Sequence, residues 1–295
     1  MTQANAETTR ATGSSASRKV LKVVRGQATS DGAGVRLTRV IGGPELPELD
    51  PFLLLDEFRS DDPNDYIAGF PEHPHRGFET VTYMLAGRMR HGDNKGNVGL
   101  LQPGSVQWMT AGRGIFHSEM PEQENGLMWG FQLWVNLPAR DKMIEPRYQD
   151  IAPDAIPTVD AGNGVRVRVI AGRFGAAVGP VHGVATEPVY LDVELPPNAS
   201  FEVPLPRNHN AFVYAYGGAV QIGASEADAR RITRGELAVL GPGDRLVVSA
   251  DGEAGRMIVV AGQPLKEPIV RYGPFVMNTR DEIRQAIEDF SAGRF

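Results

Sequence analysis

Two short motifs place candidate metal ligands at positions i and i+2. The first is His73-Pro74-His75, and the second, His117-Ser118-Glu119, follows later in the first half of the chain. Alternate side chains of a strand point to the same face, so two facing strands would bring three imidazoles and one carboxylate to a single point. Three neutral nitrogen donors and one anionic oxygen suit a divalent first-row metal with open coordination positions, non-haem iron first. The motifs therefore predict a metal site inside a β-barrel.

Another carboxylate lies near the first motif. Glu79 follows His75 by four residues and faces the same side if the strand is regular, so it could replace Glu119 as a ligand or accept a hydrogen bond from an imidazole N–H. We favour Glu119 as the ligand because it shares its strand with a histidine at the i, i+2 spacing. We assign no role to the three remaining histidines, which are His91, His182 and His209.

The elements that must position these ligands are short strands. Apolar runs, several of them alternating, are separated by turns rich in glycine and proline, which is typical of a β-barrel or a β-sandwich. In the first half we predict strands over residues 20–24, 34–41, 52–58, 79–85, 88–91, 98–101, 105–110, 114–120 and 127–135.

One helix is predicted near the end of the chain. Thr279 and Glu282 have the spacing of a capping box, the pattern that begins a helix. Apolar residues follow at i, i+3, i+4 and i+7, so one face of the helix should dock on a barrel. These residues are Ile283, Ala286, Ile287 and Phe290.

The composition excludes several classes of site. The chain has 295 residues, no cysteine and a formal net charge of −6. The lack of cysteine rules out disulfides and zinc–thiolate sites, and the acidic balance disfavours direct binding to nucleic acid. We find no secretory signal and no membrane span, and we interpret the small, polar residues 1–18 as a disordered tail on a cytoplasmic protein that does not bind membranes.

The length and an internal repeat favour two related domains. Leu101-Gln102-Pro103-Gly104 recurs as Leu240-Gly241-Pro242-Gly243, and residues 81–87 (VTYMLAG) resemble residues 211–217 (AFVYAYG). Two domains are also the usual arrangement for a chain of this length. The second series of strands should therefore repeat the first.

The domain limits follow from this repeat and from a proline-rich segment. We predict a metal-binding domain over 19–145, a linker over 146–160 and a second domain over 161–295 that includes the helix. The spacing of the repeat assigns one residue of the second domain to each of the four ligand positions. These residues do not reproduce the ligand set, so the second domain should lack the metal site. These residues are Val203, Leu205, Arg256 and Ile258.

Five segments resemble the pirin family of the cupin superfamily. Residues 70–81 (FPEHPHRGFETV) and 107–120 (QWMTAGRGIFHSEM) are similar to its two main motifs. Residues 50–58, 133–138 and 273–279 also resemble the family. The chain departs from cupins at large at one position, because a proline expected two residues before Gly114 is replaced by Gly112.

The resemblance implies a bicupin, in which two tandem jelly-roll barrels face each other and only the N-terminal one binds metal. By position, His73, His75, His117 and Glu119 would bind Fe(II), with Glu79 outside the set of ligands. Mn, Ni, Cu and Zn remain open as the metal because imidazole and carboxylate accept them too.

The resemblance to quercetin 2,3-dioxygenases among pirins makes a metal-dependent dioxygenase our first hypothesis. It would open a flavonol with O2, and Glu119 would take the proton of the 3-hydroxyl as general base. The alternative is a non-enzymatic, redox-sensitive iron-binding regulator that acts through a protein partner. A metal-assisted isomerase or lyase for sugars ranks last, because the strands around the site carry Met84, Met109, Phe116 and Trp108.

Overall fold

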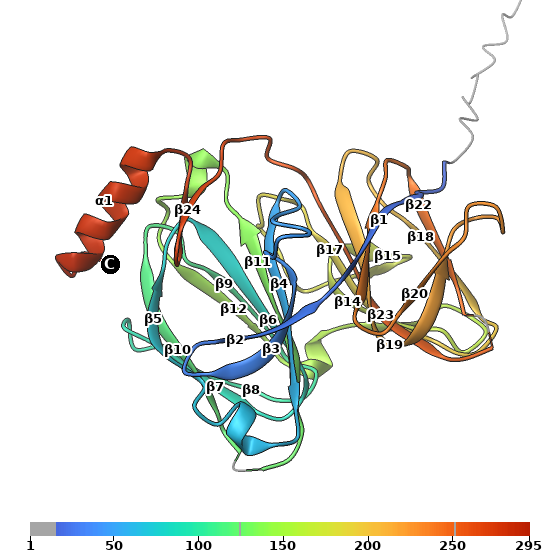
Figure 1. Cartoon of the computed structure of the whole chain (residues 1–295), viewed down its shortest axis with the longest axis horizontal. Helices are drawn as coiled ribbons and strands as arrows, with labels where there is room; N and C mark the ends of the chain where they lie inside the picture. Colours follow the sequence, from blue (N-terminus) through green and yellow to red (C-terminus); the bar gives the residue numbers. More distant parts are fainter. Residues whose placement is uncertain (1–15, 124, 251) are drawn as a thin grey trace, which may run out of the picture.

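The computed structural model describes residues 16–123, 125–250 and 252–295. Most of its regular structure is antiparallel strand, arranged as two β-barrels side by side, with the helix α1 at the outer end of the first barrel (Figure 1). The predicted all-β class, with two barrels and a short C-terminal helix, is confirmed.

The first barrel consists of two sheets, with strand orders β12-β9-β6-β11-β4-β3-β2 and β5-β10-β7-β8. The larger sheet contains β2 (Gln27–Asp31), β3 (Val35–Ile41), β4 (Phe52–Ser60), β6 (Phe78–Ala86), β9 (Val106–Thr110), β11 (Met128–Asn136) and β12 (Arg147–Ile151). The smaller sheet contains β5 (Phe70–His75), β7 (Met89–Asp93), β8 (Val98–Leu101) and β10 (Ile115–Pro121). Short 3₁₀ turns are η1 (Pro63–Asp65), η2 (Ala139–Asp141) and η3 (Pro153–Ala155).

Most predicted strands of this half agree with the structure, but β2, β5 and β12 were not among them, and β12 lies in the predicted linker. The prediction for β8 coincides with Val98–Leu101, and those for β4, β6 and β11 differ only at their ends. Strand β2 gave no signal because its sequence, QATSD, is polar and small, and all five residues are exposed. It is a strand because it pairs with β3, and not because of its own sequence.

The turn between β9 and β10 explains the departure from the general cupin pattern. Gly112 has a φ of +51°, whereas the proline ring fixes φ near −65°. A Cβ atom at this position would lie 2.2 Å from the carbonyl oxygen of Ile144. This turn therefore requires glycine.

The second barrel is built on one branched sheet in which the path β1-β21-β19-β23-β17-β14-β13 is joined by β18, β20 and β22. Its strands are β1 (Val20–Arg25), β13 (Thr158–Asp160), β14 (Arg166–Ala171), β17 (Val189–Leu195), β18 (Ser200–Pro204), β19 (Asn210–Ile222), β20 (Arg230–Thr233), β21 (Glu236–Leu240), β22 (Arg245–Ser249) and β23 (Gly255–Gly262). Two small hairpins lie outside this sheet: β15 (Arg173–Phe174) with β16 (Ala177–Val178), and β24 (Val270–Tyr272) with β25 (Phe275–Met277).

Strand pairing corrects part of the predicted repeat. Val203 of β18 pairs with Leu246 of β22, in the arrangement that places His73 of β5 opposite His117 of β10. The position predicted to match His117, Arg256, instead lies in β23, as does Ile258, and β23 corresponds to β11. That prediction was wrong.

The cause of the error is that the repeated tetrapeptide lies in two different turns. Residues 101–104 connect β8 to β9, whereas residues 240–243 connect β21 to β22. The second similarity, between residues 81–87 and 211–217, does join equivalent strands, β6 and β19. In the corrected alignment Val203 and Leu246 still offer no ligand atom.

The two ends of the chain pack on opposite barrels. Strand β1 begins the chain's regular structure but pairs with β21 of the second barrel. Arg18, placed in the predicted tail 1–18, is 1% exposed and donates to the carbonyls of Pro206, His209 and Gly241. The tail prediction was thus wrong at residue 18, and residues 1–15 lie outside the described residues. Strand pairing puts β1, inside the predicted domain 19–145, in the second barrel, and it puts β12 and β13, inside the predicted linker 146–160, in the first and second barrels. The domain limits 19–145 and 161–295 remain a proposal.

Hydrogen bonds from aromatic groups to buried carboxylates join the two barrels. Tyr83 donates to Asp192 with an O–O distance of 2.5 Å, and Tyr216 donates to the same carboxylate. Trp129 and Tyr214 both donate to Glu57. Each acid is thereby satisfied without water, which fixes the position of one barrel on the other.

The helix α1 (Arg280–Ser291) forms with the predicted capping box and packs on the first barrel. Ile283 and Ala286 are buried, and the ring of Phe290 stacks on Phe116 of β10 with 5.6 Å between centroids. Ile287 is 37% exposed, so the predicted apolar face is only partly covered. No helix in the described residues is long and apolar enough to cross a membrane.

An ion pair connects α1 to the strand end that carries His75. The buried Arg76 donates to Asp289 at 2.8 Å, and hydrogen bonds from Arg76 and Arg294 lower the pKa of Asp289 to about 2. We expect Asp289→Asn to lower the free energy of unfolding by about 2 kcal/mol at pH 7, because Arg76 loses a charged acceptor. Thermal unfolding followed by circular dichroism measures this change.

The pH dependence of the same variant tests the cause. The pKa of Asp289 is below its ordinary value of 3.8, so the pair contributes its full stability above that value and loses it as the pH falls towards 2. The difference in melting temperature between the native protein and Asp289→Asn should therefore shrink from pH 5 to pH 2. A difference that is constant over this range would contradict the ion-pair explanation.

Candidate metal centre

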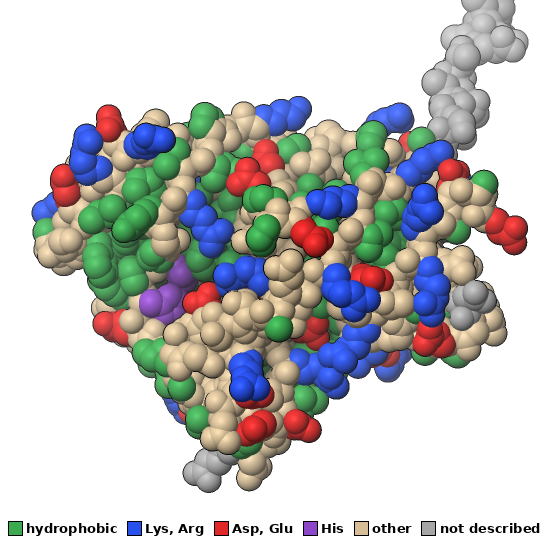
Figure 2. Space-filling model, in the orientation of Figure 1, with side chains coloured by type: hydrophobic (Ala, Val, Ile, Leu, Met, Phe, Trp, Pro, Cys, Tyr) green, Lys and Arg blue, Asp and Glu red, His purple; other side chains and the backbone are tan. Residues whose placement is uncertain are grey.

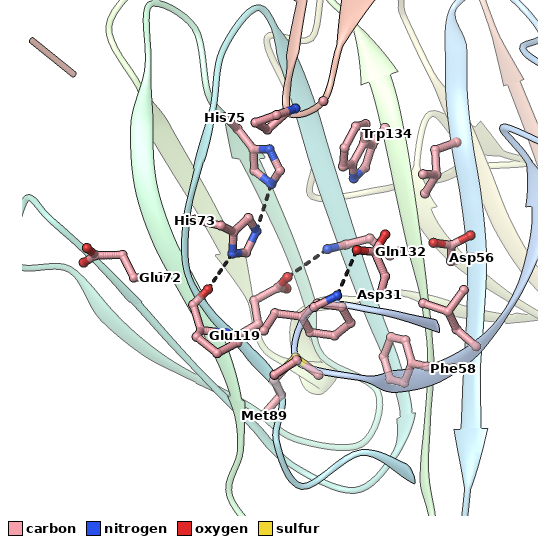
Figure 3. A pocket seen from close by; sticks show the side chains of 18 of the residues that line it. Asp31, Asp56, Phe58, Glu72, His73, His75, Met89, Glu119, Gln132 and Trp134 are labelled. Atoms are coloured by element: carbon pink, nitrogen blue, oxygen red, sulfur yellow. Dashed lines mark hydrogen bonds between the residues drawn. The ribbon is translucent and has the colours of Figure 1, made fainter. Parts of the chain in front are cut away.

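The two histidine motifs lie on neighbouring antiparallel strands. β5 pairs with β10, and His73 lies directly opposite His117. One ring nitrogen from each of His73, His75 and His117 lies within 4.8 Å of the other two. Nε2 of His73 is 3.1 Å from Nε2 of His75 (Figure 3). The three imidazoles therefore converge as the motifs predict.

The chemical state of these imidazoles fits a bound cation. Nδ1 of His73 lies 2.8 Å from the carbonyl oxygen of Pro71, which can only accept, so Nδ1 carries the proton and Nε2 presents a lone pair. Burial, and then the neighbouring imidazoles, lower the pKa of His75 and His117 well below the usual value, which keeps both neutral. Nε2 of His117 is buried with no hydrogen-bond partner among the described residues. Three imidazoles in this arrangement suit a divalent metal.

The carboxylate of Glu119 lies on the same strand as His117 and lines the same cavity as the other two histidines. The pairing of β10 with β5 shifts after His117, which places Glu119 opposite Phe70. Thr82 donates to Oε1 at 2.8 Å, and Gln132 donates to Oε2 at 2.9 Å. The close group of nitrogens does not include Glu119, so its role as fourth ligand stays a prediction.

Glu79 is buried away from the cavity lining. Its Oε1 accepts a hydrogen bond from Thr110 at 2.6 Å, and burial raises its pKa. Within the described part of the chain, no hydrogen bond joins Glu79 to an imidazole. Its carboxylate therefore contacts the strand behind the site, β9, rather than the histidines.

His91 lies beside the site although its sequence position gave no signal. Nδ1 of His91 is 3.4 Å from Nδ1 of His117, and its ring packs edge-on against Tyr148 with 4.8 Å between centroids. A lone histidine next to a turn has no ligand spacing. Only the pairing of β7 with β10, which sets His91 opposite Glu119, brings it to this place.

His73, His75 and Glu119 line a cavity of about 560 Å³ (Figure 3). In Figure 2, histidine side chains reach the surface between hydrophobic, acidic and basic side chains. Much of the cavity wall is apolar, because inward-facing residues of the first barrel lie there. These residues are Leu37, Leu54, Phe58, Phe70, Met89 and Trp134.

One part of the cavity wall is charged. Asp31 and Asp56 line it, and Arg39 donates to both carboxylates. Arg271, which follows the second barrel in the chain, lines the same wall. Sequence reasoning missed these residues because they come from four separate segments that only the fold brings together.

Two family models match the chain. The model described as Pirin matches residues 34–135, and the model described as Pirin C-terminal cupin domain matches residues 190–295. This chain is a member of the pirin family. The resemblance seen in the motifs is thus confirmed, and each barrel corresponds to one of the two pirin cupin domains.

Relatives of this pirin are similar over nearly the whole chain. A Pseudomonas aeruginosa protein, provisionally named quercetin 2,3-dioxygenase, is 53% identical over 280 residues, which are 94% of this chain and 97% of that protein. Pirin from Homo sapiens is 46% identical over 93% of this chain and 92% of its own. A crystal structure of quercetin 2,3-dioxygenase from Acinetobacter baumannii matches with a TM-score of 0.87, 36% identity, and coverage of 95% and 99% of the two chains.

Proposed function

We propose that this pirin is a metal-dependent dioxygenase that opens the central ring of a flavonol with O2 and releases carbon monoxide. His73, His75, His117 and Glu119 would bind Fe(II), or another divalent transition metal. The observation that carries the proposal is a group of three imidazoles, two of which line a largely apolar cavity of about 560 Å³. A cavity of this size accepts a small aromatic molecule. The names of the P. aeruginosa and A. baumannii proteins support the substrate class.

Glu119 would act as the general base. A divalent cation supplies positive charge that lowers the pKa of a hydroxyl next to it, as it does for water. Thr82 and Gln132 each donate to one oxygen of the Glu119 carboxylate, which fixes its position and leaves each oxygen a free lone pair. One of these lone pairs takes the proton of the flavonol 3-hydroxyl.

The apolar wall would bind the aromatic rings. Phe58, Phe70 and Trp134 lie in the cavity lining, so the substrate's flat rings gain contact with them and lose contact with water. Exclusion of water also keeps the deprotonated substrate from being reprotonated by solvent. The polar groups that remain in the wall would orient the hydroxyls of the substrate.

The decisive experiment measures oxygen uptake with quercetin. The protein is loaded with Fe(II), and the control is the same protein after chelation. The proposal expects one O2 consumed and one carbon monoxide released for each quercetin lost, only in the loaded protein. Oxygen uptake no greater than in the chelated control would reject the flavonol dioxygenase and favour the regulatory alternative.

His91 should strengthen metal binding by orienting His117. The two Nδ1 atoms are 3.4 Å apart, a distance at which one donates and the other accepts. We expect His91→Phe, which keeps a ring against Tyr148, to weaken metal binding by about 10- to 100-fold. Titration with Fe(II) under anaerobic conditions measures the affinity. His91→Gln restores a hydrogen-bonding group and should bind metal better than His91→Phe; equal affinities for the two variants would contradict the role.

A further inference from the structure

Arg271 belongs to a segment that crosses from the second barrel to the cavity of the first. It lies in β24, beyond the last strand of the second barrel, and lines the cavity together with Gly273 and Pro274. Most of the remaining wall comes from the first barrel. The C-terminal segment therefore completes the candidate active site.

The guanidinium of Arg271 contacts the indole of Trp134, and this indole in turn contacts His75 of the first motif. Its Cζ atom lies 4.8 Å from the ring centroid of Trp134. The same indole packs on Phe78, with 4.3 Å between centroids, and against the edge of His75 at 5.2 Å. Trp134 is thus fixed by its neighbours, and Arg271 covers part of its ring.

The charge of Arg271 is less compensated than that of Arg39, which lies behind the two acidic residues of the cavity wall. Arg39 donates to both oxygens of Asp56 and to Asp31, so its charge is compensated. For Arg271, no carboxylate lies within ion-pair distance in the described residues, and its guanidinium donates to the carbonyl of Leu53 over a long 3.5 Å. A guanidinium without an ion-pair partner keeps its donors available for a ligand.

We propose that Arg271 determines substrate specificity by binding an anionic oxygen group on an aromatic substrate. The ring of such a substrate would lie along the apolar wall, and its sulfonate, carboxylate or phenolate would accept hydrogen bonds from the guanidinium. This inference rests on the proposed function in one respect, that aromatic substrates bind in this cavity. It does not depend on their turnover.

Binding of two matched ligands tests the proposal. The probes are quercetin and quercetin 5′-sulfonate, which differ by one anionic group away from the 3-hydroxyl, and titration calorimetry under nitrogen measures their affinities for Fe(II)-loaded protein. We expect Arg271→Gln to weaken binding of the sulfonate by roughly 10- to 100-fold, the loss typical of a charge-assisted hydrogen bond, and that of quercetin by less than about threefold. Arg271→Lys should retain part of the preference, and added salt should weaken sulfonate binding in the native protein only.

A second arginine supplies the control. Arg59 lies over Trp129 at 4.7 Å, the same guanidinium–indole arrangement, but outside the cavity lining. Arg59→Gln should leave both affinities unchanged. If Arg271→Gln keeps the native affinity for the sulfonate, or loses both ligands equally, the inference fails. If the sulfonate effect is found but no variant and no native protein consumes O2, the proposed function fails and the role of Arg271 stands.

Discussion

Replacing His73 by alanine is expected to lower the affinity of the protein for Fe(II) by more than about 100-fold and to abolish oxygen uptake with quercetin. The loss should exceed that of an outer hydrogen-bond partner, because the variant removes one of three ring nitrogens that lie within 4.8 Å of one another. His73 is only partly buried at the cavity wall, so its removal should leave the fold intact. Elemental analysis measures the loss of metal, and far-ultraviolet circular dichroism checks that the fold is intact.

His182 provides a control with the same local geometry. Its Nδ1 lies 3.0 Å from the carbonyl oxygen of Pro180, the proline two residues before it, just as Nδ1 of His73 contacts Pro71. His182 is exposed in the other half of the chain, and among the described residues it belongs to no group that could hold a metal. His182→Ala should keep the native metal content. A His73→Ala protein with native metal content would contradict the assignment of His73 as a metal ligand.

Glu119→Gln is expected to reduce kcat for quercetin by about 10²- to 10⁴-fold, the range lost with a general base. Glutamine keeps the size of the side chain and can still accept from Thr82, and Gln132 can reverse its amide to match. The fold should therefore survive. Metal content has to be measured alongside the rate, because Glu119 is also the predicted fourth ligand.

The comparison that separates base from ligand is made at saturating Fe(II). If Glu119→Gln binds a full equivalent of metal and still turns over quercetin slowly, the decrease in kcat is caused by the loss of proton transfer. Glu72→Gln, at an exposed carboxylate of the same cavity, should keep the native rate. Full activity in Glu119→Gln would exclude its role as base.

Local spacing was enough to predict the core of the site. The i, i+2 pattern of His73 and His75 requires only that a strand alternate its side chains, and both histidines line the cavity. The same rule served less well for Glu119, because the pairing of β10 with β5 shifts after His117. An irregularity of this kind depends on the partner strand and is not visible in a single segment.

The parts that could not be predicted arise from contacts between distant segments. His91 reaches His117 only through the pairing of β7 with β10, and the charged wall brings Asp31 and Asp56 of the first barrel together with Arg271 of the C-terminal segment. The repeat was misaligned because a short glycine–proline turn recurs for reasons of backbone geometry alone. Glycine and proline show that the chain turns at a position, but they do not show which turn of one domain corresponds to which turn of the other.

The exchange of chain ends has a consequence for how this protein can be divided. Cutting within residues 146–160 would separate a first fragment without Arg271, Gly273 and Pro274 from a second fragment that carries these residues but no histidine cluster. The second fragment would also lose β1, whose partner β21 would become an open sheet edge prone to self-association. Neither fragment is thus an autonomous unit, and reconstituting the pocket from separately produced pieces would require both to fold together.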